Sequence, residues 1–303
     1  MKKKISSIII AIVVLLLYSI IETDFISDLE KNIANALKVP NETKEVVNID
    51  SGNILSVHYI DVGQADSILI KTNDYNMLID AGNNDDGKKL VKYFEELGIT
   101  KFDYVFATHA HEDHIGGMDD IINNFDIDNF YMPDVITTTK TFEDVLDALE
   151  KKFLKYSTPK IDDKYKLGSN LIDILYVGED DSDLNDTSIV LKLTHGKNTF
   201  LFTGDATSNV EKQILNKDLK SDVLKVGHHG SSYSTSNDFL NKVNPSYAVI
   251  SVGKNNNYNH PNKTILNRLK NVKLYRTDKH GTIIIKSDGN NINVETKITD
   301  TNG

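Results

Sequence analysis

A short histidine-rich segment constrains the fold of this chain more than any other feature. Residues 108–114 read Thr-His-Ala-His-Glu-Asp-His, so three imidazoles and two intervening carboxylates follow directly on an apolar, strand-like run. Two more histidines are adjacent at His228 and His229, and another stands at His260. Six of the nine histidines therefore fall into three local clusters, each beside a glycine or a proline. This clustering is typical of a metal site, and such a site requires distant strand ends to meet.

The first cluster predicts donors for two ions. His109 and His111 are expected to converge on one ion, because residues i and i+2 of an extended segment point to the same side. Asp113 and His114 lie at the turn before Gly116 and are expected to face a second ion. The alternative is that the histidines are core residues and that Asp113 caps a helix. The density and order of the donors favour the metal site.

Three later segments offer further candidates, two where apolar strands end and the third, His260, after the polar loop 254–259. Asp205 is expected to bridge two cations, and its alternative role is a helix N-cap. Neighbouring strand residues face opposite ways, so only one of His228 and His229 is expected to bind metal. We favour His229 as the ligand, with His228 lining the cleft, while His260 is a candidate to support a developing charge or leaving group. The candidates for catalysis are Asp113, His228 and His260.

The composition narrows the possible ligands and partners. The chain has no cysteine, so any metal must be held by nitrogen and oxygen donors. The formal net charge of −10, with 44 acidic against 34 basic residues, disfavours electrostatic binding of duplex nucleic acid. It does not forbid a phosphate ester at a site whose largest local charges are metal cations. A length of 303 residues, 39% of them hydrophobic, predicts a globular protein with a substantial core.

The N-terminal residues 1–22 predict a signal-anchor or transmembrane segment. Three lysines precede an apolar stretch of 17 residues, Ile5 to Ile21. This is short of the roughly 20 residues of a typical span, a deficit that flanking residues and local bilayer thinning can cover. The lysines should stay in the cytoplasm, which places the rest of the chain outside. The alternative is secretion after signal cleavage, although no small-residue cleavage site follows the apolar run. Residues 23–52 are predicted to be a tether, and residues 53–303 the folded domain.

From residue 54 onward, a strands-then-helices order occurs twice along the chain. This order predicts an α/β protein in which two sheets face each other with helices outside. In the first half, strands are expected at 55–60, 67–71, 76–80 and 102–107, and helices at 87–97 and 141–155. In the second half, strands are expected at 171–176, 188–194, 199–203, 223–226 and 248–251, helices at 208–215, 237–243 and 263–269, and short closing strands near 274, 283 and 294.

The histidine cluster resembles the His-x-His-x-Asp-His signature of metallo-β-lactamase-fold hydrolases, and residues 54 to about 295 follow that family's order. A closer resemblance is to the hydrolase domain of ComEC-type competence DNA-uptake proteins and their free-standing relatives. It is carried by residues 58–67 (HYIDVGQADS), 224–231 (LKVGHHGS), 250–253 (ISVG) with His260-Pro261, and 275–278 (YRTD). The resemblance implies an αββα sandwich, here preceded by the transmembrane helix, with a two-metal site at one edge of the sheets.

The resemblance also implies a ligand set. His109 and His111 would hold one metal, Asp113, His114 and His229 (or His228) the other, and Asp205 would lie between them. The family usually has a histidine upstream of this aspartate, where the present chain reads Asn185-Asp186-Thr187-Ser188. Asn185 is therefore the candidate at that place, and the harder donor set leaves manganese as an alternative to the expected zinc. Asp80, which ends a strand, is predicted to orient a ligand imidazole from behind.

Three functions are compatible with these features. The leading hypothesis is a membrane-anchored, extracytoplasmic, metal-dependent hydrolase of phosphoric esters, a phosphodiesterase or nuclease whose substrate could be single-stranded nucleic acid. The first alternative resembles the phosphorylcholine esterases of cell surfaces, acting on a choline-bearing polymer. Tyr233 and Tyr258 flank the site segments and could cradle a quaternary ammonium, although both could equally be ordinary loop residues. The second alternative is a catalytically silent binding module that the metal only stabilises.

Overall fold

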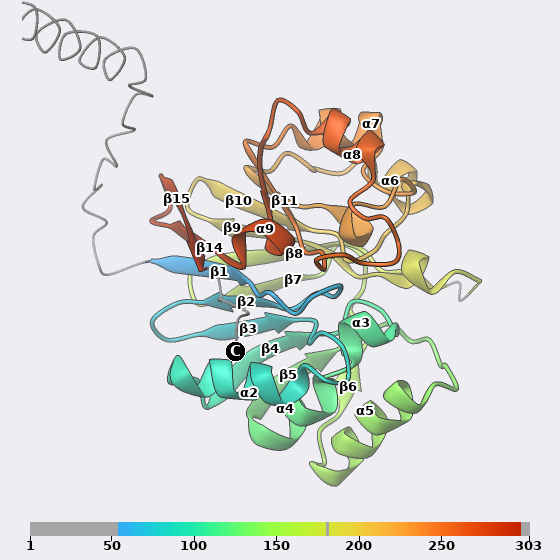
Figure 1. Ribbon diagram of the computed structural model, residues 1–303. Helices are drawn as coiled ribbons and strands as arrows, with labels where there is room; N and C mark the ends of the chain where they lie inside the picture. The colour runs from blue at the N-terminus through green and yellow to red at the C-terminus, as the bar shows by residue number, and fades with distance from the viewer. Residues whose placement is uncertain (1–53, 180–181, 298–303) are drawn as a thin grey trace, which may run out of the picture. The chain divides into compact units, whose positions relative to one another are not determined.

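Two mixed β-sheets face each other in the computed structural model, which describes residues 54–179 and 182–297 (Figure 1). The predicted anchor (1–22) and tether (23–52) lie outside the described residues. Within the described part of the chain, no helix combines the length and the apolarity that crossing a membrane requires.

The first sheet has eight strands in the order β15-β14-β1-β2-β3-β4-β5-β6. Pairing is antiparallel from β15 to β3 and parallel from β3 to β6. Its strands are β1 (Leu55–Tyr59), β2 (Ile68–Lys71), β3 (Asn76–Ile79), β4 (Lys101–Phe106), β5 (Asp126–Tyr131), β6 (Tyr156–Ser157), β14 (Thr282–Ser287) and β15 (Ile292–Lys297).

The second sheet has seven strands in the order β13-β12-β11-β10-β9-β8-β7. Strands β10 to β13 are parallel, and β7 to β10 pair antiparallel. Its strands are β7 (Lys164–Leu167), β8 (Asn170–Tyr176), β9 (Val190–His195), β10 (Asn198–Phe202), β11 (Val223–Lys225), β12 (Tyr247–Ile250) and β13 (Lys273–Arg276).

Helices cover the outer face of each sheet, so the layers are helix, sheet, sheet, helix (Figure 1). Helix α5 shows the local cause: Thr139 caps its N-terminus, and Phe142, Val145 and Leu149 form its buried stripe. The first sheet carries α2 (Gly87–Glu96), α4 (Met118–Asn124) and α5 (Lys140–Lys151), and the second α6 (Ser208–Ile214), α7 (Asn237–Val243) and α8 (Lys263–Arg268). Short turns of helix are α3 (Glu112–Ile115), α9 (Thr277–His280) and the 3-10 helices η1 (Leu184–Thr187) and η2 (Gly227–Gly230).

This topology brings distant parts of the sequence to one edge. Strands β3 and β4 are parallel in the first sheet, as are β10, β11 and β12 in the second. The carboxyl ends of parallel strands meet at the same edge, where ligands of α/β proteins usually bind. Asp80 follows β3, His109 follows β4, Asp205 follows β10 and His229 follows β11. The two-sheet α/β fold predicted from the sequence is confirmed.

One buried histidine, which contacts Tyr93 of helix α2, predicts a pH-dependent stability. Burial, followed by the charges of Lys297 and Lys286, lowers the pKa of His58 from 6.5 to about 4, and its Nδ1 lies 2.7 Å from the Tyr93 hydroxyl. The unfolded chain therefore takes up this proton first as the pH falls. The stability that neutral His58 contributes is fully present above about pH 6.5. It is lost as the pH falls to about 4, which lowers the free energy of unfolding by about 3 kcal/mol.

Urea unfolding at pH 7 and pH 4.5 measures this loss. The variant His58→Gln should lose less unfolding free energy between the two pH values than the wild type, by about 2–3 kcal/mol. Equal losses in the two proteins would show that His58 does not couple protonation to folding.

Candidate metal centre

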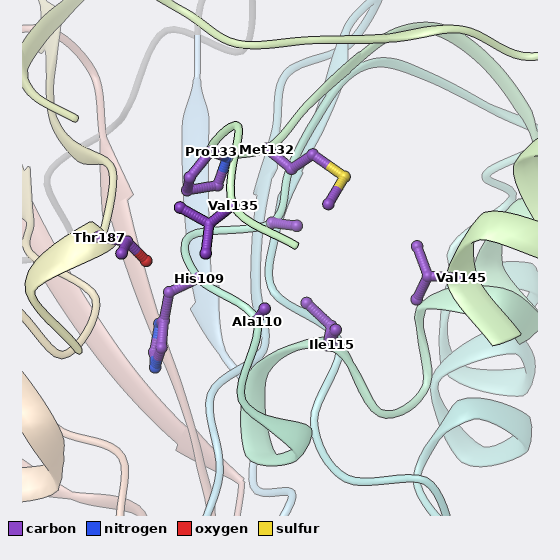
Figure 2. A pocket seen from close by; sticks show the side chains of 9 residues that line it. His109, Ala110, Ile115, Met132, Pro133, Val135, Val145 and Thr187 are labelled. Atoms are coloured by element: carbon purple, nitrogen blue, oxygen red, sulfur yellow. The ribbon is translucent and has the colours of Figure 1, made fainter. Parts of the chain in front are cut away.

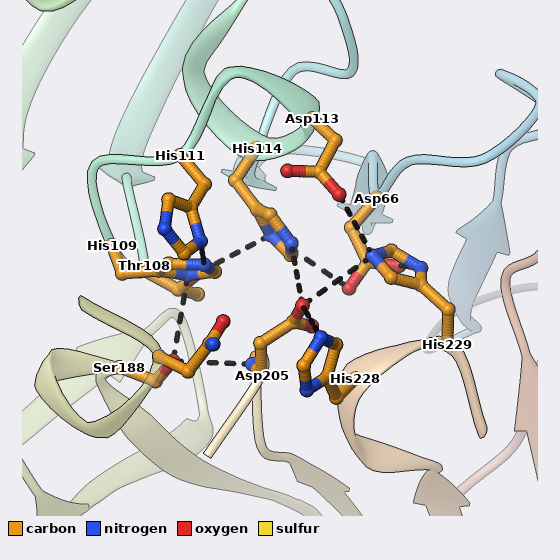
Figure 3. Close-up of polar contacts among 12 residues, drawn as sticks. Asp66, Thr108, His109, His111, Asp113, His114, Ser188, Asp205, His228 and His229 are labelled. Carbon is orange, nitrogen blue, oxygen red and sulfur yellow. Dashed lines mark hydrogen bonds and ion pairs between the residues drawn. The ribbon is translucent and has the colours of Figure 1, made fainter. Parts of the chain in front are cut away.

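The histidine cluster forms a tight constellation at the end of β4 (Figure 3). Nε2 of His109 lies 3.1 Å from Nδ1 of His111, so the two imidazoles converge as an extended segment allows. Helix α3 begins immediately afterwards and carries Asp113 and His114. His111 stands at the N-cap position, so Asp113 is not the cap of this helix.

Asp205 joins the donors of the two sheets. Its Oδ2 lies 3.3 Å from Nε2 of His114, 3.5 Å from Nε2 of His229 and 3.7 Å from Nε2 of His228 (Figure 3). The side chain that caps α6 is Thr207, so the alternative role of Asp205 as an N-cap is wrong. The Asp205 carboxylate is thus buried among three imidazoles, and its negative charge stabilises positive charge on any of them.

The two adjacent histidines lie in a sharp turn. Strand β11 ends at Lys225, and His228 and His229 have φ angles of 49° and 52°. The argument from strand alternation is therefore wrong, since neither residue belongs to a strand. His229 is buried, with Nδ1–H donating to the carbonyl of Ser251 at 2.9 Å and Nε2 lying 3.2 Å from Oδ2 of Asp113. His228 is half-buried on the cleft side, which makes His229 the better placed donor.

Asp80 holds one imidazole in orientation. Its carboxylate accepts hydrogen bonds from Nδ1 of His114 at 2.7 Å, from the backbone of Thr108 at 2.7 Å and from the Thr108 hydroxyl at 2.8 Å. Nε2 of His114 then points toward Asp205. This is the contact that a carboxylate behind a metal-binding imidazole makes.

The donors open into a cleft of about 430 Å³. Asn185 borders it from η1, and its Oδ1 is buried without a hydrogen bond in the described part of the chain. His260 lies on the side of His228, with ring centroids 5.7 Å apart, and the Tyr258 ring stacks on it at 5.8 Å. The lining residues are Gln64, Asn83, His111, Glu112, Asp113, Asn185, Asp205, His228, His229, Tyr258 and His260.

Neighbouring charges shift the pKa values of the carboxyl and imidazole groups in the centre. Burial opposes the ionisation of Asp205, but His229 and His114 outweigh it and hold the pKa of this carboxyl well below its ordinary value. Burial would likewise lower the pKa of His114, yet Asp205 and Asp80 raise it well above the ordinary value. The carboxylates therefore favour a positive charge among them, which the proton on His114 supplies in the absence of a metal and a bound cation would supply beside the neutral imidazole.

His109 has a different environment from His114. It also lines a small, mostly apolar pocket with Ala110, Met132, Val135 and Val145 (Figure 2). Burial, with a further contribution from His114, lowers the pKa of His109 well below its ordinary value. A neutral imidazole is the form that binds a metal.

The buried polar atoms test whether these residues fit metal ions. Among the described residues, His114 Nε2, His229 Nε2, Asp205 Oδ1 and Asn185 Oδ1 are buried without a satisfactory hydrogen bond. Leaving such atoms unpaired costs roughly 1–3 kcal/mol each. Ligand atoms of Asp113, His114, Asp205 and His229 all lie within 4.8 Å of one another. Nitrogen and oxygen donors in this arrangement fit divalent cations.

Sequence reasoning missed four side chains that support these donors. The hydroxyl of Ser188 accepts from the backbone of Asp205 at 3.1 Å and lies 3.4 Å from Nδ1 of His109. Thr108 anchors Asp80, as described above. Asp66 and Lys225 form a buried ion pair behind His114 and His229. Both lie in segments that carry the family resemblance, but nothing in either segment indicates that they pair.

Two competence proteins are similar to this chain in sequence. ComE operon protein 3 of Bacillus subtilis (strain 168) is 30% identical over 250 residues, which are 75% of this chain and 32% of that protein. Competence protein ComA of Neisseria gonorrhoeae is 31% identical over 244 residues, 76% of this chain and 32% of the relative. The chain thus spans about a third of the length of these curated relatives. The predicted resemblance to ComEC-type competence proteins is confirmed.

A solved structure and a family match lead to the same classification. The metallo-beta-lactamase fold protein YhfI from Bacillus subtilis has a TM-score of 0.55 and 14% identity, covering 78% of this chain and 100% of that one. This likeness concerns the fold alone. Residues 60–254 match the metallo-beta-lactamase superfamily. The chain therefore belongs to the metallo-beta-lactamase superfamily.

Proposed function

We propose that this chain is a metal-dependent phosphodiesterase whose catalytic domain is held outside the cytoplasm by an N-terminal anchor. The observation that carries the proposal is the position of Asp205, whose Oδ2 lies within 3.3–3.7 Å of imidazoles from both halves of the sandwich. The fold implies divalent metal ions. A buried carboxylate that contacts imidazoles from both sheets, and whose charge also acts on His109, suits a bridge between two such ions.

Each of the two proposed ions has its own donors. His109 and His111 would hold one ion beside the side-chain amide oxygen of Asn185. Asp113, His114 and His229 would hold the other. Zinc is the expected metal, and manganese is the alternative because an amide oxygen replaces an imidazole. Bound divalent cations supply a water of lowered pKa and neutralise the charge of a phosphoryl group.

The remaining polar groups of the cleft act on the substrate. His228 and His260 border the same side of the cleft, and Nδ1 of each is buried without a hydrogen bond in the described structure. Imidazoles in this position can hold the leaving oxygen and pass a proton to it. Asp80 keeps the His114 ring fixed, which preserves the geometry of the centre during turnover.

Single-stranded nucleic acid is the substrate class that we favour. The similarity to competence proteins of Bacillus subtilis and Neisseria gonorrhoeae supports it. The net charge of −10 disfavours a long electrostatic interface, so binding would depend on the few nucleotides nearest the cations.

A choline-bearing surface polymer is the second candidate, and one observation favours it. The Tyr258 side chain lines the cleft and remains 68% exposed although its ring stacks on His260, so part of the ring is accessible to a quaternary ammonium. Tyr233, which follows the histidine turn, is also exposed. A catalytically silent module is disfavoured because five expected donors are all present: His109, His111, Asp113, His114 and Asp205.

A hydrolysis panel tests the proposal. The purified full chain, loaded with zinc or with manganese, is expected to hydrolyse bis(p-nitrophenyl) phosphate and a single-stranded oligonucleotide. It should spare nitrocefin, which probes β-lactam hydrolysis. Faster turnover of p-nitrophenyl phosphorylcholine than of the oligonucleotide would favour the choline polymer instead. A metal-loaded chain that hydrolyses none of these phosphoesters would support the silent module.

The anchor is tested separately by fractionation. We expect the full-length chain in the membrane fraction, released only by detergent, with residues 53–303 digestible by protease added to the outside of intact cells. Detergent-free recovery of the uncleaved chain from the cytosol would contradict the anchor.

A further inference from the structure

Behind the donors lies an ion pair that the proposed chemistry does not use. Oδ2 of Asp66 lies 2.5 Å from Nζ of Lys225, and the two side chains are 1% and 0% exposed. Nζ of Lys225 also donates to the carbonyl of Val226 at 3.1 Å. A fully buried lysine is rare, and desolvation of both charges offsets most of their attraction. Net stability alone therefore gives little reason for this pair.

The pair connects the two halves of the donor set. Asp66 belongs to the loop between β1 and β2, and its backbone N–H donates to the carbonyl of Asp113 at 3.0 Å. Its own carbonyl accepts from Gly82 at 2.8 Å, just beyond Asp80. Lys225 is the last residue of β11, directly before the turn that carries His229. One ion pair thus joins the first-sheet donors to the second-sheet donors.

The carboxylate of Asp66 faces the rear of two imidazoles (Figure 3). Its Oδ2 lies 3.9 Å from Nδ1 of His114, and its Oδ1 lies 3.9 Å from Nδ1 of His229. Oδ1 is buried with no hydrogen-bond partner among the described residues. In both rings Nε2 points the other way, toward Asp205. Asp66 therefore places negative charge behind the two rings whose front nitrogens meet in the centre.

Asp66, Asp80 and His114 also lie close enough together to hold a cation of their own. The ammonium of Lys225 already supplies the positive charge there, at 2.5 Å from Asp66. A further metal ion would have to displace a buried lysine that has nowhere else to place its charge. The pair is thus better explained as support for the main centre than as another metal site.

We propose that Asp66 and Lys225 are positioning residues for the metal centre: together they set the spacing of its two halves and hold a carboxylate behind His114 and His229. This inference rests on the metal centre of the proposed function and not on the choice of substrate. Groups that support metal ligands in this way typically change metal affinity by about 10–100-fold when they are replaced.

Four variants of the full chain separate positioning from stability. Lys225→Met and Asp66→Asn each break the pair, and the double variant removes both charges. Lys192→Met is the matched control, because Lys192 is a nearly buried lysine of the same sheet whose partner is the exposed Asp218. Each protein is titrated with zinc alone, and with manganese alone, against a chelator of known affinity. Tm without metal is measured in parallel.

We expect Lys225→Met to lower Tm by roughly 10 °C, since it leaves a buried carboxylate unpaired. It should also weaken metal binding by about 10–100-fold. The double variant should regain most of the Tm and still bind metal at least about tenfold more weakly than the wild type. The control should keep the wild-type affinity.

Metal binding by the double variant that matches the wild type would overturn the inference, leaving the pair a purely structural contact. Failure of the double variant to fold would also overturn it, because the fold itself would then need the pair. If a single variant fails to fold, the double variant alone decides. A wild-type chain that binds neither zinc nor manganese would instead contradict the metal centre, so the two failures are distinguishable.

Discussion

Alanine in place of His109 is expected to reduce hydrolysis of bis(p-nitrophenyl) phosphate by roughly a thousandfold or more and to remove bound metal. The imidazole is buried, and its Nε2 lies 3.1 Å from Nδ1 of His111, so the variant removes one of two converging nitrogen donors. Steady-state kinetics and metal analysis of the same preparation measure both effects. Asp113→Ala should behave in the same way, because its carboxylate lies 3.2 Å from Nε2 of His229.

His195→Ala is the matched control for these variants. This histidine is also buried, but its Nδ1 lies 2.8 Å from the hydroxyl of Ser287 and it does not line the cleft. We expect the folded fraction of this variant to keep its metal and its turnover. Equal losses in His109→Ala, Asp113→Ala and His195→Ala would contradict the assignment of the centre.

Gly116→Ala is expected to lower the free energy of unfolding by roughly 3 kcal/mol or more. A Cβ atom at Gly116 would lie 2.2 Å from the backbone carbon of Asn83 and 2.2 Å from the backbone nitrogen of Asn84. Neither backbone atom can move without displacing the loop after β3, which follows Asp80. The cost is steric, because Gly116 has an ordinary helical φ of −58°. Urea unfolding of metal-free protein measures it.

Gly98→Ala is the comparison for that prediction. Gly98 has a φ of +72°, and no described atom lies within 4 Å of the position of its Cβ. Its replacement should cost only the backbone strain, about 1–2 kcal/mol. If the two variants unfold with equal free energies, the close approach of α3 to the Asn83 backbone is not rigid.

Much of the fold follows from local pattern. Apolar runs such as 68–70 and 200–202 are buried as strands, and the spaced apolar side chains of α5 are buried as a helical stripe. Strand β5 was not predicted, because Asp126, Asp128 and Asn129 break the apolar pattern. It forms because its backbone pairs with β4 on one side and with β6 on the other. Such pairing is a property of the sheet and has no local signature.

The donors were predictable to the extent that their residue types cluster in sequence. His109, His111, Asp113 and His114 stand together, and the structure brings Asp205 to them. The choice between His228 and His229 could not be made, because it depends on a turn with positive φ at both residues. Asp66 and Lys225 were missed for a related reason: an ion pair between residues so distant in the sequence becomes visible only when the two sheets meet.

Metal content is the most direct test of the claim that two distant donor sets meet around divalent cations. The purified full chain is loaded with zinc or manganese, freed of unbound metal and analysed by inductively coupled plasma mass spectrometry. We expect two ions per chain in the wild type and a marked loss in Asp205→Asn, because the Asp205 carboxylate contacts His114 from the first sheet and His229 from the second. A folded wild-type chain that retains no divalent metal above the buffer would contradict the metal centre and the hydrolase built on it.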